Sequence, residues 1–155
     1  MNQWEMEVRL AKEGDFDCFL LAGRYTLLDH TALQEFLPLC QEKNISVIIG
    51  GPYNSGILAS DLTETATFNY VPATSEVLEQ ARRCNAVCLR HDVPLKAAAL
   101  QFVLAHPAVA AAIPGPRSLA EAEENFQMIA HPIPAALWQE LRDEGLVPTE
   151  APTPQ

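Results

Sequence analysis

The sequence predicts an α/β fold built on a parallel sheet, and three observations support this fold class. Three short apolar runs, residues 17–22, 45–49 and Val109–Ile113, barely alternate between polar and apolar residues. Strands covered on both faces of a parallel sheet have this composition. Helical patterns of apolar residues separate the runs, and a turn containing glycine follows each of them. Strands and helices in this alternating order form βα units around a parallel sheet.

The helices are predicted from apolar residues at helical spacing and from proline and glycine near the ends of each pattern. Pro94 and Pro134 stand where proline opens a helix, and Pro107 stops one. The expected helices cover residues 4–11, 29–43, 75–91, 95–105 and 134–145, and a further helix begins near Ser118.

The predicted fold is incomplete in two respects. The helix at residues 4–11 has no strand before it, and three strands cannot close a barrel or protect both sheet edges. We therefore expect the chain to start in the middle of a larger α/β fold, of which residues 1–146 form about three βα units. Residues 147–155 are rich in proline and threonine and are expected to form a disordered tail.

Composition excludes several classes of partner. The chain has 155 residues, a net charge of −10 and 48% hydrophobic residues. This charge argues against binding to nucleic acid or to an anionic membrane, since both need clustered lysine and arginine. The start of the chain lacks the pattern of a signal peptide. The most apolar region, residues 95–113, is interrupted by polar residues and proline, whereas a membrane span needs about 20 apolar residues.

Cysteine usage predicts a cytoplasmic protein without a metal site. Cys18, Cys40, Cys84 and Cys88 lie within apolar patterns and form no disulfide framework, which suits a reducing compartment. Cys84, Cys88 and His91 share one face of a helix, as zinc ligands could. The same face continues with apolar residues, so we interpret it as core.

Candidate binding residues follow the strands, because ligands of parallel α/β folds bind at the carboxyl ends of strands. The loop from Gly51 to Gly56 has the spacing of a phosphate-binding loop, but Ile57 and Leu58 replace the lysine and hydroxyl residue that such a loop requires. Its free N–H groups and the Ser55 hydroxyl can hold an anion. A tight turn between strand and helix remains the alternative.

The loop after the third run offers donors at the start of a helix. Pro114 and Gly115 bring the backbone close to whatever lies above the strand, and Arg117 and Ser118 stand where the helix macrodipole favours phosphate. Asn125 can both donate and accept, which suits the edge of a base such as adenine.

Together these strand ends resemble the C-terminal part of the aldo-keto reductases, most closely the bacterial branch of L-fucose (D-threo-aldose) and pyridoxal dehydrogenases. The resemblance runs from Met1 to about Gly145. The residues that carry it are Gly23-Arg24-Tyr25-Thr26-Leu27-Leu28-Asp29, Ile48-Ile49-Gly50-Gly51-Pro52-Tyr53-Asn54-Ser55-Gly56-Ile57-Leu58, and Ala112-Ile113-Pro114-Gly115-Pro116-Arg117-Ser118 through Glu124-Asn125.

The resemblance implies a (β/α)8 barrel of which this chain supplies the last three strands. It also implies NAD(P)-dependent oxidation of a sugar such as an aldose, or of a related alcohol or aldehyde, as a small-molecule substrate of the intact enzyme. The residues that match cofactor-binding positions are Asn2, Gly50, Gly51, Tyr53, Ser55, Gly115, Pro116, Arg117, Ser118, Glu121, Glu124 and Asn125.

These matches imply separate roles along a dinucleotide. Asn2 matches a residue that binds the nicotinamide carboxamide, and the loop that begins at Gly50 matches the one around the pyrophosphate. The segment from Gly115 to Ser118 matches the surroundings of the adenosine ribose, and Glu124 and Asn125 match adenine contacts. Glu121 stands where many NADP-dependent members have arginine, which favours NAD over NADP.

The resemblance places no catalytic residue in this chain. The family uses an aspartate, a tyrosine, a lysine and a histidine from its first four strands, and all four lie upstream of what matches Met1. Tyr25, Tyr53 and Tyr70 follow other strands. Two alternatives stay open, namely a noncatalytic nucleotide-binding or interaction module and a nonfunctional fragment. The open sheet edges predict a complementing barrel half or self-association.

Overall fold

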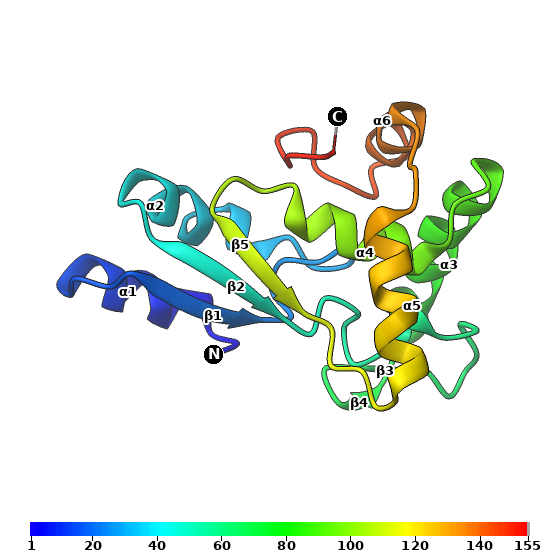
Figure 1. The fold of residues 1–155 in the computed structure, drawn as a ribbon, viewed down its shortest axis with the longest axis horizontal. Coiled ribbons are helices and arrows are strands. Elements are labelled where there is room, and N and C mark those ends of the chain that lie inside the picture. Colours follow the sequence, from blue (N-terminus) through cyan, green and yellow to red (C-terminus); the bar gives the residue numbers. More distant parts are fainter. Residues whose placement is uncertain (155) are drawn as a thin grey trace.

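A computed structural model describes residues 1–154 as one parallel three-stranded sheet flanked by helices (Figure 1). The strands β1 (Cys18–Ala22), β2 (Ser46–Gly50) and β5 (Val109–Ile113) lie in the order β1-β2-β5. Leu20 pairs with Ile48, and Ile48 pairs with Ala111. The register between β2 and β5 shifts once, between Val47 and Ile48. The predicted strands are confirmed to within one residue at each end.

The helices are α1 (Trp4–Glu13), α2 (Phe36–Glu42), α3 (Ser75–Arg90), α4 (Leu95–Leu104), α5 (Leu119–Ala130) and α6 (Ala135–Asp143). The prediction of one helix over residues 29–43 is wrong, because the 3-10 helix η1 (Thr31–Leu33) ends before α2 begins. Pro38 explains the break. Inside a continuous helix it would remove a backbone hydrogen bond and clash with the carbonyl of residue 34, but the first turn of α2 tolerates it.

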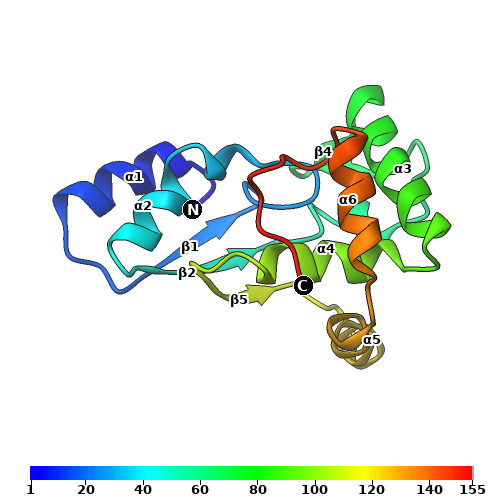
Figure 2. The same cartoon turned by 90° about the horizontal axis from the view of Figure 1, so that it is seen from above.

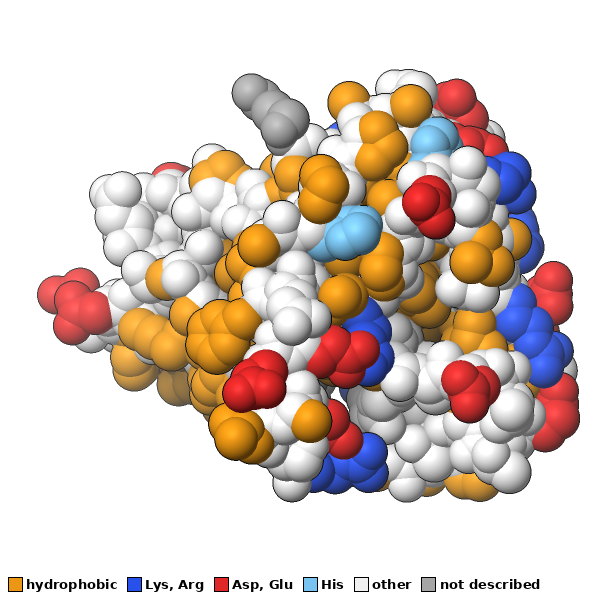
Figure 3. All heavy atoms as spheres, turned by 45° about the vertical axis from the view of Figure 1, so that its right-hand side comes forward, with side chains coloured by type: hydrophobic (Ala, Val, Ile, Leu, Met, Phe, Trp, Pro, Cys, Tyr) orange, Lys and Arg blue, Asp and Glu red, His pale blue; other side chains and the backbone are white. Residues whose placement is uncertain are grey.

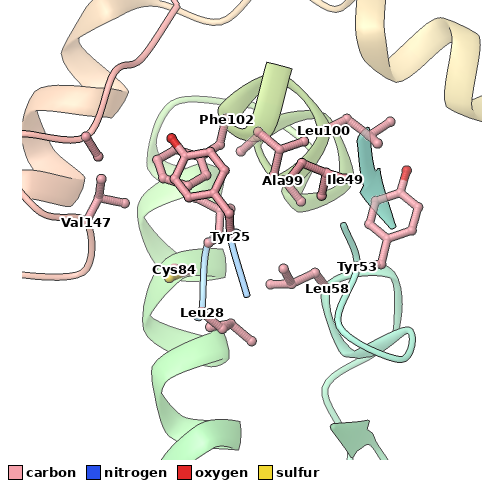
Figure 4. Close-up of a cluster of buried hydrophobic side chains, with 14 of the residues drawn as sticks. Tyr25, Leu28, Ile49, Tyr53, Leu58, Cys84, Ala99, Leu100, Phe102 and Val147 are labelled. Atoms are coloured by element: carbon pink, nitrogen blue, oxygen red, sulfur yellow. The ribbon is translucent and has the colours of Figure 1, made fainter. Parts of the chain in front are cut away.

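One face of the sheet is covered by helices. Its side chains Phe19, Leu21, Val47 and Ile49 are buried, and Figure 2 shows α1 and α2 packed along this side. The largest aromatic cluster lies beside the sheet, where the rings of Tyr25 and Phe102 are 5.0 Å apart (Figure 4). This face and the helices above it hold the core of the chain.

The opposite face of the sheet is bare within the described residues. Leu20 on β1 remains 43% exposed, Ile113 on β5 remains 49% exposed, and Cys18 is exposed beside them. The apolar strand sequences predict cover on both faces, and the chain supplies it on only one. We call the side chains of Cys18, Leu20, Ile48, Ala111 and Ile113 the inner face from here on.

The segment after α6 is packed, which corrects the expectation of a disordered tail. Val147 and Ala151 are buried, and Figure 4 shows Val147 near the aromatic cluster. The Arg142 guanidinium donates to the carbonyl of Ala151 at 3.0 Å and to the hydroxyl of Thr153 at 2.9 Å. Two apolar side chains and one arginine therefore hold a segment whose composition alone predicts disorder. None of the helices in residues 1–154 is long and apolar enough to cross a membrane.

Met1 pairs with the outer edge of β1 and so adds one residue to the sheet on that side. Its amino group donates to the carbonyl of Leu20, and its own carbonyl accepts from the N–H of Ala22 at 2.7 Å. This pair of bonds, on either side of Leu21, is the hydrogen-bond pattern of a parallel ladder. Met1 therefore occupies the position of a residue in a further parallel strand, and Asn2 follows it at the carboxyl end of the sheet.

Candidate cofactor site

The carboxyl ends of the strands are tied together by backbone hydrogen bonds. Gly23 donates to the carbonyl of Gly50 at 3.0 Å, and Gly51 donates to the carbonyl of Ile113 at 3.2 Å. The loops after the three strands therefore start side by side. Gly51 and Gly115 have φ angles of 61° and 68°, the left-handed region that favours glycine. A Cβ at either position would meet no atom within 4 Å, so these loops keep their backbone open toward a ligand.

A groove of about 630 Å³ runs between the loop after β2, the segment that follows it and the loop leading into α5. Nine of the twelve predicted cofactor residues line this groove. They are Gly51, Tyr53, Ser55, Gly115, Pro116, Arg117, Glu121, Glu124 and Asn125. Figure 3 shows that this side of the molecule carries acidic and basic side chains close together, with hydrophobic side chains gathered beside them.

A buried hydrogen bond joins the two walls of the groove. The Tyr53 hydroxyl donates to Asn125 Oδ1 at 2.6 Å, and both side chains are buried. Burial, with a smaller contribution from Glu124, raises the pKa of Tyr53 far above its usual value, so this phenol stays protonated. The bond occupies Asn125 Oδ1 and leaves the amide group as the donor that a base can use.

The start of α5 forms a charged cap at the mouth of the groove. Ser118 accepts from the N–H of Glu121 at 3.1 Å, as an N-cap residue does. The Glu121 carboxylate accepts from the backbone N–H of Arg117 at 2.7 Å and from its guanidinium at 3.1 Å. These bonds to Arg117 lower the pKa of Glu121. The serine and glutamate thus stabilise the helix start, a role that the spacing of Ser118 and Glu121 in the sequence also fits.

A second ion pair lies on the same wall. Lys96 of α4 contacts Glu124 of α5 at 2.6 Å, and both residues line the groove. Sequence reasoning named Glu124 but missed Lys96, because nothing in the α4 sequence separates this lysine from an ordinary surface charge.

Three predicted residues lie outside the groove. Ser118 points into the helix cap. Gly50 is buried at the end of β2, where a Cβ would lie 3.2 Å from Leu20 Cδ2 and 3.6 Å from Ala22 Cβ. Asn2 lies beyond β1 and lines a separate cavity of about 600 Å³ together with Trp4, Arg9, Arg24, Asp29 and Thr31.

Sequence analysis missed a short hairpin that borders the groove. Its strands are β3 (Thr67–Phe68) and β4 (Val71–Pro72), and its turn residues Asn69 and Tyr70 have φ angles of 51° and 65°. Tyr70 is 92% exposed, and its N–H donates to the Ser55 hydroxyl at 3.0 Å. The Ser55 hydroxyl therefore fixes the hairpin to the loop after β2. Strands of two residues carry no periodicity, so only Asn69 hinted at a turn.

The remaining polar candidates are structural. Cys84 and Cys88 are buried in the core, where burial raises the pKa of each thiol to about 12. His91 contacts Glu140 of α6 at 2.5 Å. Within residues 1–154 no group of histidine, cysteine or acidic side chains is arranged to hold a metal ion.

Comparison with known proteins adds the context that the geometry lacks. A model of the Aldo/keto reductase family matches residues 2–144. Pyridoxal 4-dehydrogenase of Microbacterium luteolum is 40% identical over 147 residues, which are 95% of this chain and 43% of that protein. D-threo-aldose 1-dehydrogenase of a Pseudomonas species is 38% identical over 91% of this chain and 43% of its own length.

A solved structure of the same family has a similar fold. The holo form of the aldo-keto reductase AKR11C1 from Bacillus halodurans superposes with a TM-score of 0.70 and 25% identity, over 92% of this chain and 47% of that one. The chain thus spans a little under half the length of the relatives that it matches.

Proposed function

This chain belongs to the aldo/keto reductase family, and we propose from this premise that it forms the cofactor-binding part of an NAD(P)-dependent oxidoreductase. The family and the partial barrel fold predicted from the sequence are confirmed. The single observation that supports cofactor binding is the groove in which nine of the twelve proposed residues meet.

The chemistry of the groove fits a dinucleotide. The open glycine backbones at Gly51 and Gly115 allow close approach of a pyrophosphate, and the free Asn125 amide suits a base edge. NAD, when bound, supplies the acceptor for a hydride. The residues of this chain bind and orient the cofactor, and the proton acceptor of the reaction lies outside the chain.

Glu121 favours NAD over NADP in this proposal. Its carboxylate pairs with the Arg117 guanidinium and so offsets part of the positive charge that would attract a 2′-phosphate. The carboxylate would also repel that phosphate, whereas it can accept a hydrogen bond from a ribose hydroxyl. The substrate in this proposal is a sugar or related alcohol, since the relatives include a D-threo-aldose 1-dehydrogenase and a pyridoxal 4-dehydrogenase.

Calorimetric titration of the chain with NAD tests the proposed site, and two matched glycine variants supply the control. Gly115 and Gly145 both have a φ angle of 68° with open space around them, but only Gly115 lines the groove. Asparagine tolerates this backbone conformation. Gly115→Asn should weaken NAD binding at least about tenfold, and Gly145→Asn should leave it unchanged. No binding by the unmodified chain, or equal effects of the two variants, would contradict the proposal.

Turnover separates this part from a complete enzyme. We expect no NADH formation from L-fucose or D-arabinose by the chain alone, because none of its tyrosines is placed as an acid–base group. Tyr25 is fully buried, Tyr53 donates to Asn125, and the side chain of Tyr70 projects into solvent from the hairpin turn. Turnover that a substitution within this chain abolishes would overturn that assignment.

The exposed inner face favours association with further strands. A complementing barrel half, or a second copy of the chain, would bury Leu20 and Ile113 and pair the free edge of β5 and the part of the β1 edge that Met1 leaves open. A noncatalytic interaction module remains the second candidate function. It predicts association through the inner face without NAD binding, so the titration described above distinguishes it.

A further inference from the structure

We propose that Arg24 is a positioning residue that holds the main chain of Asn2 at the nicotinamide end of the cofactor site. The inference rests on the proposed function and on the match of Asn2 to a family residue that binds the nicotinamide carboxamide. It assigns a role to an arginine that lies outside the groove and that contributes no group to the proposed binding set.

The guanidinium of Arg24 bridges two segments that are far apart in the sequence. Its Nε donates to the carbonyl of Asn2 at 3.0 Å, and a terminal nitrogen donates to Asp29 Oδ2 at 3.0 Å. The other oxygen of Asp29 accepts from the N–H of Thr31 at 3.1 Å and from its hydroxyl at 2.6 Å. Asn2 is thereby connected to the ordered turn after β1.

That turn is itself firmly held. The buried Thr26 hydroxyl accepts from the N–H groups of Leu28 and Asp29, and the N–H of Thr26 donates to the carbonyl of Asp29 at 2.8 Å. The carbonyl of Arg24 accepts from the N–H of Ala32 at 3.2 Å. The backbone of Arg24 is therefore fixed, and its planar guanidinium is oriented by hydrogen bonds to Asn2 and to Asp29.

Asn2 needs such a contact because the ladder ends one residue earlier. Met1 makes both of its ladder bonds to β1, whereas Asn2 follows it and lies exposed beside the end of that strand, close to the N-terminus marked in Figure 1. Fixing one backbone residue costs conformational entropy. A contact that fixes the residue before the ligand arrives removes that cost from binding.

Stability of the fold does not account for this ion pair. The side chains of Arg24 and Asp29 are 25% and 12% exposed, and partly exposed pairs contribute little net stability. Arg9 lines the same cavity and makes no ion pair with any of residues 1–154. Arg24 bonds to both Asn2 and Asp29, whereas Arg9 makes no ion pair in the same cavity. Arg9 is therefore a matched control.

Binding of two ligands to the full chain tests the proposal. NAD carries the nicotinamide, and ADP-ribose is the same molecule without it. The unmodified chain should bind NAD more tightly than ADP-ribose. Arg24→Met should weaken NAD binding about tenfold and leave ADP-ribose binding within about twofold. Arg24→Lys keeps a charge for Asp29 but lacks the planar fork, so its affinity for NAD should lie between those of the unmodified chain and Arg24→Met. Arg9→Met should change neither affinity.

The outcomes separate the two proposals. If the unmodified chain binds neither ligand, the proposed function fails and this inference fails with it. If it binds both ligands but Arg24→Met weakens them equally, or weakens neither, only the role of Arg24 is overturned. Thermal melting of each variant, together with the ADP-ribose titration, shows whether the variant is folded. A loss confined to NAD is a result that general unfolding would not give.

Discussion

The two faces of the sheet differ in how far this chain completes them. On the outer face, Leu21 is fully buried beneath the helices, while its neighbour Leu20 on the inner face is 43% exposed. Both faces are equally apolar in sequence, so the difference arises from what packs on them. The outer face is a finished core, and the inner face has the composition of a barrel interior without the strands that would fill it.

The same contrast extends to α5. Its side chains Leu119, Phe126 and Ile129 are exposed, with Phe126 at 75%. Soluble domains rarely leave large apolar side chains together in water unless the surface binds a partner. The groove at the strand ends combines features of the finished outer face and the unfinished inner face. Its polar groups are paired within the chain, while its glycine loops remain open.

The largest expected difference between the two faces comes from substitutions at two adjacent leucines. Leu21→Ala should lower the free energy of unfolding by about 2–5 kcal/mol, since it leaves a cavity in a packed core. Leu20→Ala removes the same atoms from the inner face and should cost less than about 1 kcal/mol. Denaturant unfolding of both variants measures the difference. Equal losses would show that the inner face is covered after all.

Sequence reasoning found the strands and the longer helices but not the difference between the faces. The runs that became β1, β2 and β5 are apolar throughout, which correctly predicts a parallel sheet but cannot show which neighbouring strands are present. The barrel followed only from the family resemblance. It missed the split before Pro38 and the hairpin at Thr67–Pro72, because one depends on the position of proline within a helix turn and the other is too short to show a period.

Of the candidate site, the sequence identified the loops on both sides of the groove. It assigned Ser118 and Glu121 to the cofactor, whereas in the structure they also cap α5 and hold Arg117. It could not foresee that Gly50 is buried or that Asn2 faces a separate cavity. These facts depend on side chains from other segments, which no local pattern contains.

Acid should lower the free energy of unfolding through protonation of a buried histidine. Burial lowers the pKa of His106 to about 4, and its Nδ1 accepts from the N–H of Ala108 at 3.2 Å. Because the folded pKa lies below the unfolded value of 6.5, stability is full above about pH 6.5 and is lost as pH falls toward 4. The contribution of His106 to this loss between pH 7 and pH 5 should be about 2 kcal/mol.

His106→Asn isolates this contribution, since an amide oxygen can replace the acceptor without titrating. The variant should lose less stability than the unmodified chain between pH 7 and pH 5, as followed by thermal melting at each pH. An identical loss in both proteins would remove His106 from the explanation. His30, whose pKa burial also lowers to about 4, would then be the residue to replace.

At the mouth of the groove, the charge of residue 121 should determine the preference between NAD and NADP. Glu121→Arg replaces repulsion of a 2′-phosphate by attraction and frees Arg117. The ratio of NADP to NAD affinity should rise about tenfold, which corresponds to about 1.4 kcal/mol. Glu123→Arg makes the same charge change on an exposed residue of α5 and is the control. An unchanged ratio in Glu121→Arg, or an equal rise in the control, would disprove this role of Glu121.

The smallest effect concerns the strained turn of the hairpin. Tyr70 adopts a left-handed backbone conformation while its side chain is 92% exposed, so no burial offsets the strain. Tyr70→Gly should raise the free energy of unfolding by about 0.5–1 kcal/mol, as glycine adopts this conformation without a steric penalty. Asn69→Gly, at the neighbouring left-handed residue, should gain less because asparagine tolerates the conformation. Urea unfolding that ranks the two variants in the reverse order would argue against strain at Tyr70.

Sedimentation velocity combined with thermal melting tests the central claim, that the inner face is an unfinished barrel interior. We expect the chain at micromolar concentration to self-associate, because Leu20 and Ile113 are exposed to water, the outer edge of β5 is unpaired and the outer edge of β1 is paired only with Met1. Replacing both side chains by lysine should shift the sedimenting species toward monomer. A compact monomer with a sharp cooperative melt, unaffected by these substitutions, would contradict the claim and show that the chain is a self-sufficient domain.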